Sequence, residues 1–449
     1  MQIECAEYQT EDRATPTAHG ARTSAADYDE ATEIFDELLK TDNLDEHIAS
    51  RPPAVETFEN ALAHALDAAY NVDSYRARTD ADDDHAQASS NTAPAPVVAA
   101  HISNIAAVTA AHLFLQRVLY RINRLKFFWY DDLRNYDNER SEYLRHVRRR
   151  IETPWQEGEQ AQLDVDALRR EDVREALLSR AAADVSPAPS ASGLYFRDEV
   201  GEAGYRRLLA IASLDGLVEA SQLSRTLGGV SNDVHAVMTR LLVEEYGGGK
   251  IQRKHSTFFT SMLTELGMCT EPEGYFELVP WEVLAAINHS FLLSERKRLY
   301  LRYVGGLLYT EVSVPASFDH YRAAAERLGM SEAARGYWEL HIKEDERHGR
   351  WMLHDVALPL AAKYPREAWE IVLGYDQQKF MSDRAGAGVE RSVREAERED
   401  VRGGRETARD MKHEATPRAH HEAMQVAQRE AAREAGRAHA ARKAQEVGA

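Results

Sequence analysis

The sequence predicts an all-α protein, and two observations carry this prediction. Apolar residues recur at helical spacing through most of residues 28–380, whereas the alternation of β-branched and polar residues that marks strands is scarce. Segments rich in Pro, Ser and Ala separate the helical stretches at 77–97 and 184–193. The chain has 449 residues and is 43% hydrophobic, so it can bury a sizeable core.

The N-terminal part combines acidic segments with helices. Residues 1–26 have no apolar period and are predicted to be disordered, and helical patterns follow at 28–50 and 54–76. A long apolar helix is expected from residue 98 to the aromatic cluster at 127–130, and the segment SEYLRHVRRRIE predicts another helix.

Further helical patterns follow one another closely after residue 196. They are placed at 196–228, 230–247, 251–267, 277–290, 294–328, 331–362 and 364–380. Beyond residue 381 the chain is nearly all Ala, Arg, Glu and Gln, which predicts an exposed helix or a disordered tail. We therefore expect four regions: an acidic arm of two helices and a linker (1–97), a helical region (98–183), a bundle core (196–380) and a charged tail (381–449).

The net charge of −19 is concentrated near the N-terminus. Residues 1–95 contain 21 acidic and 6 basic side chains, which gives −15, whereas residues 381–449 contain 13 acidic and 14 basic ones, which gives +1. Without a basic face, the chain is not expected to bind nucleic acid. The start of the chain lacks the features of a signal peptide, and no uninterrupted apolar run reaches about 18 residues, so we expect a cytoplasmic protein that does not cross a membrane. Cys5 and Cys269 are too few for a disulfide framework or a Cys-rich metal site.

One segment near the end of the bundle core carries the strongest functional signal. His341, Asp345 and His348 fall within roughly 60° of one another on a helix. Trp338 and Met352 extend the same face as an apolar stripe, so the face is expected to point inward. Two imidazoles and a carboxylate in a core are costly unless something compensates them, and two histidines with one carboxylate are a known iron(II) ligand set. The sequence therefore predicts a buried iron site.

Two acids in other apolar segments are candidate ligands for the same site. Glu311 stands among apolar residues in LLYTEVSVP, where an unpaired carboxylate would be expensive to bury; alternatively, it is an acid at a helix end near Pro315. Glu219 lies one helical repeat from Asp215 in LLAIASLDGLVEASQL; alternatively, it is an ordinary acid of an amphipathic helix.

A third segment contains adjacent acids, a glycine run and a histidine. Glu244 and Glu245 point about 100° apart on a helix, so only one of them can readily face inward. Gly247–Gly249 allow the helix to break with unusual dihedral angles, so that His255 can return to the same site. Taken alone, the acids would mark an exposed helix end and the histidine a surface or core residue. Other histidines of the core and the tail are expected to be structural or solvated: His289, His320, His354, His413, His420 and His421.

The order Glu245 with its glycine run, His255, Glu311 and then His341-x-x-x-Asp345-x-x-His348 resembles the heme-oxygenase-like diiron oxidases and oxygenases, also described as iron-containing redox enzymes. The resemblance covers about residues 200–360 and implies a heme-oxygenase-like helical bundle. It implies Fe(II), two ions per chain, and a ligand set of seven residues: Glu219, Glu245, His255, Glu311, His341, Asp345 and His348. Glu219 resembles a carboxylate that only some members supply, notably those that oxygenate nitrogen. Ferritin-like proteins instead use two Glu-x-x-His motifs, which this chain lacks.

The resemblance implies an O2-activating, non-heme oxidase or oxygenase that acts on a small amine- or carboxylate-bearing molecule. Its electron donor is not identified by the sequence, and a homodimer stays open. Two alternatives also stay open: a metal-free or single-metal relative of the same fold, and a non-enzymatic helical protein that binds partners through its arm and tail.

Overall fold

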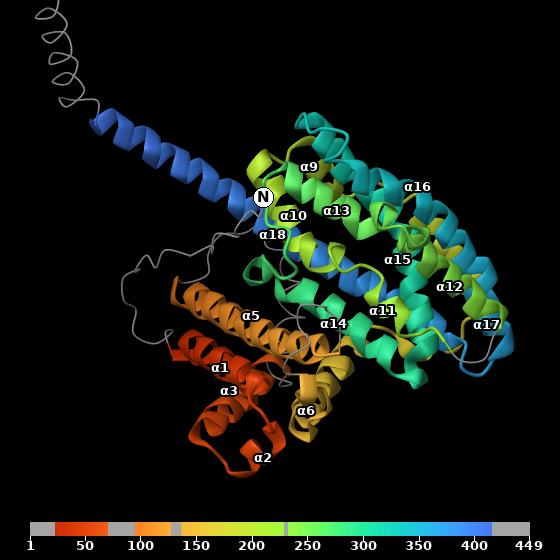
Figure 1. Cartoon of the computed structure of the whole chain (residues 1–449), viewed down its shortest axis with the longest axis horizontal. Helices are drawn as coiled ribbons and strands as arrows, with labels where there is room; N and C mark the ends of the chain where they lie inside the picture. The colour runs from red at the N-terminus through yellow and green to blue at the C-terminus, as the bar shows by residue number, and fades with distance from the viewer. Residues whose placement is uncertain (1–22, 71–94, 127–135, 229–231, 415–449) are drawn as a thin grey trace, which may run out of the picture. The chain divides into compact units, whose positions relative to one another are not determined.

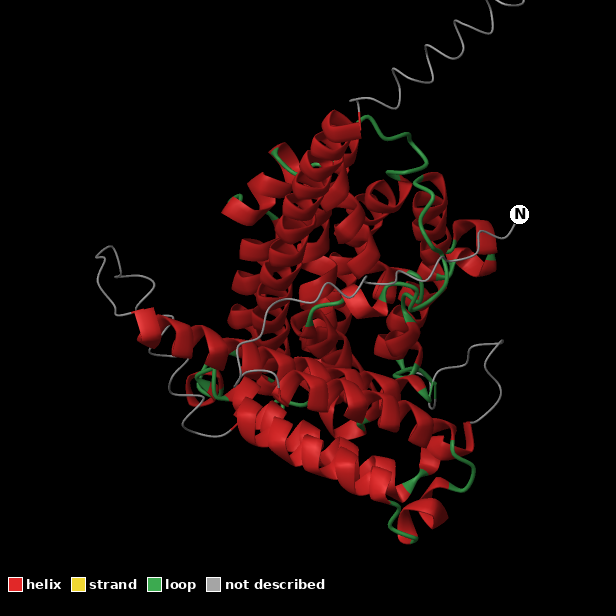
Figure 2. Cartoon of the chain, turned by 90° about the vertical axis from the view of Figure 1, so that its left-hand side faces the viewer, coloured by secondary structure: helices red, strands yellow, loops and turns green. Residues whose placement is uncertain are grey.

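The structure, a computed structural model, describes residues 23–70, 95–126, 136–228 and 232–414. Every regular element in these ranges is a helix, as the sequence predicts, and the fold is an all-α, heme-oxygenase-like bundle with further N-terminal helices (Figures 1 and 2). The predicted linker at 77–97 and the aromatic cluster at 127–130 fall mostly or wholly outside the described ranges, as do residues 1–22 and 415–449.

The N-terminal helices are α1 (Thr23–Lys40), α2 (Leu44–Ala49), α3 (Pro53–Tyr70), α5 (Ala95–Arg124), α6 (Glu142–Gln160), α7 (Val165–Leu168) and α8 (Val173–Val185). The helices that follow are α9 (Ala191–Asp198), α10 (Glu202–Gly216), α11 (Ser221–Ser224), α12 (Asp233–Glu245), α13 (His255–Glu265), α14 (Trp281–Glu295), α15 (Tyr300–Arg327), α16 (Gly336–Trp351), a π-helical segment (Met352–Ala357), α17 (Leu358–Lys363) and α18 (Trp369–Glu414).

Helices α1, α3 and α5 lie side by side (Figure 1). Aromatic and alanine side chains hold them together. Phe35 of α1 stacks on Phe58 of α3 with ring centroids 4.9 Å apart, and Tyr28 stacks on Phe114 of α5 at 5.1 Å. These contacts bury the apolar stripe that predicts the helices from the sequence. On the opposite side, α5 contacts α14, where the amide of Asn123 donates to the buried side chain of Asn288 at 2.9 Å. The N-terminal helices and the bundle helices share one continuous hydrophobic core.

Two helices at the centre of the bundle approach closely because both carry glycine. A Cβ atom on Gly305 of α15 would lie 1.9 Å from the carbonyl oxygen of Ile371, and one on Gly374 of α18 would lie 2.0 Å from that of Arg302. Such distances are impossible for any other residue without moving a helix. The guanidinium of Arg302 pairs with Glu370 at 2.5 Å beside this crossing. The crossing fixes α15, which presents Glu311 to the interior.

Three of the helices predicted after residue 196 differ from the observed ones. The expected helix at 196–228 is wrong: the chain breaks before α10 and again after it, so Glu219 lies in the turn between α10 and α11. The expected helix at 331–362 begins at Gly336 and changes to a π-helical segment at Met352. The expected helix at 364–380 is longer, since α18 runs to Glu414.

The break after α10 coincides with two features of the chain. Gly216, the last residue of α10, lies directly against the ring of Phe259, where any side chain would clash, and Ala220 adopts a left-handed conformation with φ of 63°. An amphipathic pattern cannot reveal either feature. Among the described residues, those up to Ser392 form one compact unit, and the end of α18 from Val393 to Glu414 belongs to a second.

Candidate metal centre

The seven predicted ligands come from five segments of the bundle. Glu219 lies in the turn after α10, Glu245 ends α12, His255 begins α13, Glu311 lies in the middle of α15, and His341, Asp345 and His348 lie on α16. The structure brings all seven together in the interior. Glu219 is partly buried, and the other six are buried. Glu311 is therefore not an acid at a helix end, because α15 continues past Pro315 to Arg327.

The first cluster comprises Glu219, Glu245, His255 and His341, whose ligand atoms all lie within 4.8 Å of one another. The Nε2 atom of His341 lies 3.1 Å from Oε1 of Glu219 and 3.2 Å from Nδ1 of His255. That Nδ1 atom lies 3.0 Å from Oε2 of Glu245. Two imidazole nitrogens and two carboxylates thus face one point, as the ligands of a metal ion do.

The second cluster comprises Glu245, Asp345 and His348, with Glu311 beside it. The Nδ1 atom of His348 lies 3.5 Å from Oε1 of Glu245, 3.5 Å from Oδ1 of Asp345 and 3.3 Å from Oε2 of Glu311. The ring is fully buried, yet Nδ1 forms no hydrogen bond with any of the three. A buried nitrogen facing three carboxylates without hydrogen-bond geometry fits a site built around a cation.

Glu245 belongs to both clusters, one oxygen facing each. Its Oε2 atom is nearest to His255, and its Oε1 atom faces His348. A carboxylate placed between two sets of ligands in this way can bridge two metal ions. The donor atoms are carboxylate oxygens and imidazole nitrogens with no thiolate, a set suited to iron.

The concentration of acids changes the pKa values of the cluster. Burial raises the pKa of Glu311 to about 7 despite the proximity of His348, and Asp345 adds to the rise. Burial alone would lower the pKa of His341, but Glu219, Asp345 and Glu245 raise it to about 10. The clustered carboxylates therefore stabilise positive charge in the site, which protons or metal ions can supply.

Glu244, the residue that the sequence left as an alternative to Glu245, has a different place. Its Oε2 atom accepts a hydrogen bond from Nε2 of His348 at 3.0 Å, on the far side of the ring from the clustered carboxylates. It also accepts one from Arg347 at 2.5 Å, and Arg347 also pairs with Glu344. Glu244, Glu344 and His348 are close enough to hold an ion themselves, but the guanidinium between the two acids already compensates them. The role of Glu244 is to orient His348.

Tyr337 contacts two candidate ligands and was not singled out by the sequence. Its hydroxyl donates to Oε1 of Glu219 at 2.5 Å, and its carbonyl accepts from Nδ1 of His341 at 2.9 Å. The second contact leaves Nε2 of the neutral imidazole free for a metal. Its position in the sequence could have indicated this role, because Tyr337 stands four residues before His341 and so lies on the same helix face.

The glycine run folds as the sequence predicts. Gly247, Gly248 and Gly249 all have positive φ, and a Cβ atom on Gly247 would lie 2.3 Å from the backbone of Arg253. Only glycine allows the chain to turn this tightly between α12 and α13. The turn places His255 beside Glu245.

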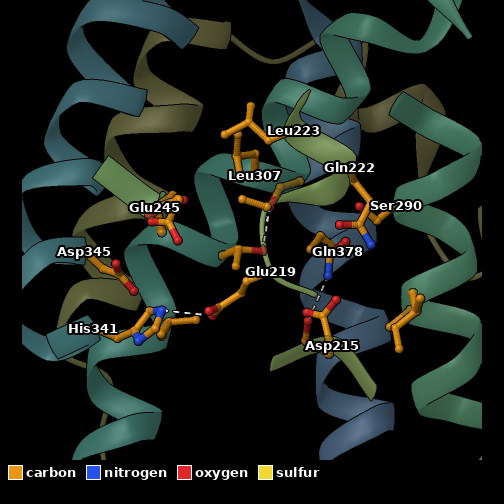
Figure 3. A pocket seen from close by; sticks show the side chains of 18 of the residues that line it. Asp215, Glu219, Gln222, Leu223, Glu245, Ser290, Leu307, His341, Asp345 and Gln378 are labelled. Carbon is orange, nitrogen blue, oxygen red and sulfur yellow. Dashed lines mark hydrogen bonds and ion pairs between the residues drawn. The ribbon is translucent and has the colours of Figure 1, made fainter. Parts of the chain in front are cut away.

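A cavity of about 310 Å³ adjoins the first cluster (Figure 3). Glu219, Glu245, His341 and Asp345 lie on one side of it, and Asp215 lies on the other (Figure 3). This volume is at the lower end of the range for small-molecule sites. The arrangement therefore provides a wall of candidate metal ligands and room for a small molecule.

The comparison with known families bears on this site directly. Residues 206–377 match the model of the family described as iron-containing redox enzymes. The resemblance predicted from the sequence is confirmed. All seven candidate ligands lie within the segment that matches the iron-containing redox enzymes.

The chain is also similar to a nitrosourea synthase from Streptomyces achromogenes subsp. streptozoticus. The two are 30% identical over 171 residues, which is 37% of this chain and 36% of that protein. The chain thus matches little more than a third of that relative's length. Within the described residues, no helix is long and apolar enough to span a membrane.

Proposed function

We propose that this protein is an iron-dependent, O2-activating oxidase or oxygenase with a diiron centre. One observation carries the proposal: two clusters of carboxylates and imidazoles meet at Glu245 beside a cavity. The first ion would be held by Glu219, Glu245, His255 and His341. The second would be held by Glu245, Glu311, Asp345 and His348. The match to iron-containing redox enzymes supports iron as the metal.

Charge balance supports two ions rather than one. The four candidate carboxylates, Glu219, Glu245, Glu311 and Asp345, carry four negative charges when ionised, which two Fe(II) ions would neutralise. A buried group of charges is tolerable only when it is compensated in this way. When bound, iron would supply the reduction of O2 that no side chain can perform.

The protein's own residues would hold, orient and shield this chemistry. Tyr337 fixes both Glu219 and the tautomer of His341, and Glu244 fixes His348. The rings of Phe318 and Trp338 pack 4.7 Å apart beside His341 and exclude water from that side. Such fixed ligands need little rearrangement during a reaction.

The substrate is proposed to be a small molecule with an oxidisable nitrogen. The name of the nitrosourea synthase denotes a product with a nitrogen–nitrogen bond. Glu219 also supports a nitrogen-containing substrate, because it resembles the additional carboxylate of nitrogen-oxygenating members. The cavity of about 310 Å³ would place such a molecule against the first cluster.

Iron binding tests the proposal. The full chain is purified without oxygen, loaded with Fe(II), desalted and assayed for iron, and O2 is then admitted while the visible spectrum is followed. We expect about two irons per chain and a transient absorption after O2 is added. One tightly bound iron would support the single-metal alternative. The absence of both iron and a spectral change would refute the proposal.

A further inference from the structure

A second acid faces the cavity from the wall opposite the metal ligands. Asp215 lies in the last turn of α10, and its side chain borders the cavity across from Glu245, Asp345 and His341 (Figure 3). Much of its side chain is accessible, although protein surrounds it closely enough for burial to dominate its pKa. This accessible side chain lines the cavity.

No protein cation compensates this carboxylate. Throughout the described ranges, no Lys, Arg or His side chain forms an ion pair with Asp215, and its favourable partner is the side-chain amide of Gln222. Burial and the nearby charge of Glu219 raise the pKa of Asp215 to about 6, so it is still largely ionised at neutral pH.

Carboxylates dominate the charge of the cavity. Its lining contains five of them, Asp215, Glu219, Glu245, Glu311 and Asp345, and one imidazole, His341, with no Lys or Arg among the described residues of its lining. Two metal ions would neutralise the four ligand carboxylates, which leaves Asp215 as the remaining negative charge. A carboxylate that is desolvated by surrounding protein and lacks a cationic partner is costly to keep, and a cation bound in the cavity would reduce that cost.

The neighbours of Asp215 suit an amphipathic molecule. Gln222, Ser290 and Gln378 supply hydrogen-bonding groups on the same side of the cavity (Figure 3). Leu223 and Leu307 supply apolar surface between that side and the metal ligands. A short aliphatic chain with a charged end would satisfy both kinds of surface.

We propose that Asp215 binds a positively charged nitrogen group of the substrate, either an ammonium or a guanidinium, and so positions the rest of the molecule at the metal centre. This inference rests on the proposed function, because it takes the opposite wall of the cavity to be the metal centre. It also implies that a substrate whose main charged group is a carboxylate would be rejected, because every charged side chain of the lining would repel it except His341.

The test uses four probes with short aliphatic chains: n-butylamine, n-butylguanidine, n-butanol and butyrate. Their affinities for the full chain are measured by calorimetry, with and without Fe(II), in the absence of oxygen. We expect at least one of the two cations to bind about tenfold or more tightly than butanol, and butyrate to bind most weakly. Asp215→Asn should abolish the preference for the cation, and Asp215→Glu should retain part of it.

Glu202→Gln is the matched control, because Glu202 is an exposed acid at the other end of α10 that pairs with Arg206. It should leave all four affinities unchanged. Iron content and thermal unfolding of Asp215→Asn show whether the variant is folded. Equal binding of cations and butanol, or no measurable binding of either cation, would overturn the inference. So would a cation preference that survives in Asp215→Asn.

The outcomes separate this inference from the proposed function. If the chain binds no iron but the preference for cations still depends on Asp215, the diiron proposal fails and the cation site stands. If iron loads as expected and the preference is absent, the cation site fails and the diiron proposal stands.

Discussion

The Nε2 atom of His348 donates a hydrogen bond to Glu244 at 3.0 Å, while Nδ1 of the same ring faces Glu245, Asp345 and Glu311. Because a carboxylate can only accept, this contact assigns the proton of the neutral ring to Nε2 and leaves Nδ1 free to bind metal. Glu244 and Glu245, which are adjacent on α12, thus lie on opposite sides of the His348 ring.

Removing this contact should weaken the second metal site without destroying it. Glu244→Ala is expected to lower the Fe(II) affinity of that site about 10- to 100-fold, the usual effect of losing such an orienting partner. Competition with a chelator measures the affinity. Glu346→Ala is the control, since Glu346 is exposed and pairs with Arg350 of the same helix. An unchanged affinity in Glu244→Ala would show that His348 needs no orientation.

The shared position of Glu245 predicts a difference in iron stoichiometry between two variants. Glu245→Ala removes a carboxylate from both clusters and should leave well under one iron per chain. Glu219→Ala removes a carboxylate from the first cluster alone and should leave about one. Iron content after desalting, together with circular dichroism to check the helical fold, distinguishes the two. Equal iron content in both variants would contradict a bridging role for Glu245.

The ligands of the second cluster should be essential for turnover but not for folding. His348→Ala and Glu311→Ala are each expected to abolish iron-dependent O2 consumption and to retain helical circular dichroism, because the core helices are held by apolar packing. His354→Ala should have no effect, since that side chain is exposed on the segment that follows α16. Turnover that persists in either ligand variant would discredit its assignment. His420→Ala, in the tail outside the described ranges, should also leave iron-dependent O2 consumption unchanged.

Gly247 should be far less replaceable than another glycine with similar backbone angles. Gly267 has φ of 63° with nothing near its missing Cβ, so Gly267→Ala should cost about 1–2 kcal/mol in the free energy of unfolding from backbone strain alone. Gly247→Ala adds a clash with the backbone of Arg253 and should cost more. It should also lower iron content, because the clash displaces His255. Urea unfolding and iron analysis measure the two effects. Similar losses in both variants would refute the tight-turn explanation.

The stability of the protein should fall in mild acid because of His289. Burial, with Arg302 and Arg384 nearby, lowers the pKa of His289 from 6.5 to about 3. Between these values the unfolded chain binds a proton that the folded chain does not, so the free energy of unfolding decreases as the pH falls below 6.5. The contribution approaches about 1.4 kcal/mol per pH unit. His289→Gln should show a shallower decrease than the parent in urea titrations between about pH 5 and 7. Parallel pH profiles would exclude this origin.

Much of the fold and most of the candidate site follow from local patterns in the sequence. His341, Asp345 and His348 share a helix face because four- and three-residue spacings return to the same side, and the observed α16 buries all three. The glycine run predicts the break that returns His255. In both cases the information lies within one helix or one turn.

Other features depend on contacts between distant segments and could not be predicted in this way. Glu219 was expected on a helix, but α10 ends at Gly216, which lies against Phe259, and Ala220 adopts a left-handed conformation. The choice between Glu244 and Glu245 depends on the direction from which α16 packs against α12. The place of Asp215 on a cavity depends on α14 and α18, which supply Ser290 and Gln378 beside it.

The continuous core that joins the N-terminal helices to the bundle limits how the protein can be divided. Phe35, Phe58 and Phe114 belong to the same buried apolar cluster as residues of α12, α15 and α16's continuation, the π-helical segment. An expression fragment limited to the segment shared with iron-containing redox enzymes would expose one side of that cluster to water and is expected to aggregate. Crystallisation or engineering should therefore start from a clone that retains α1, α3 and α5.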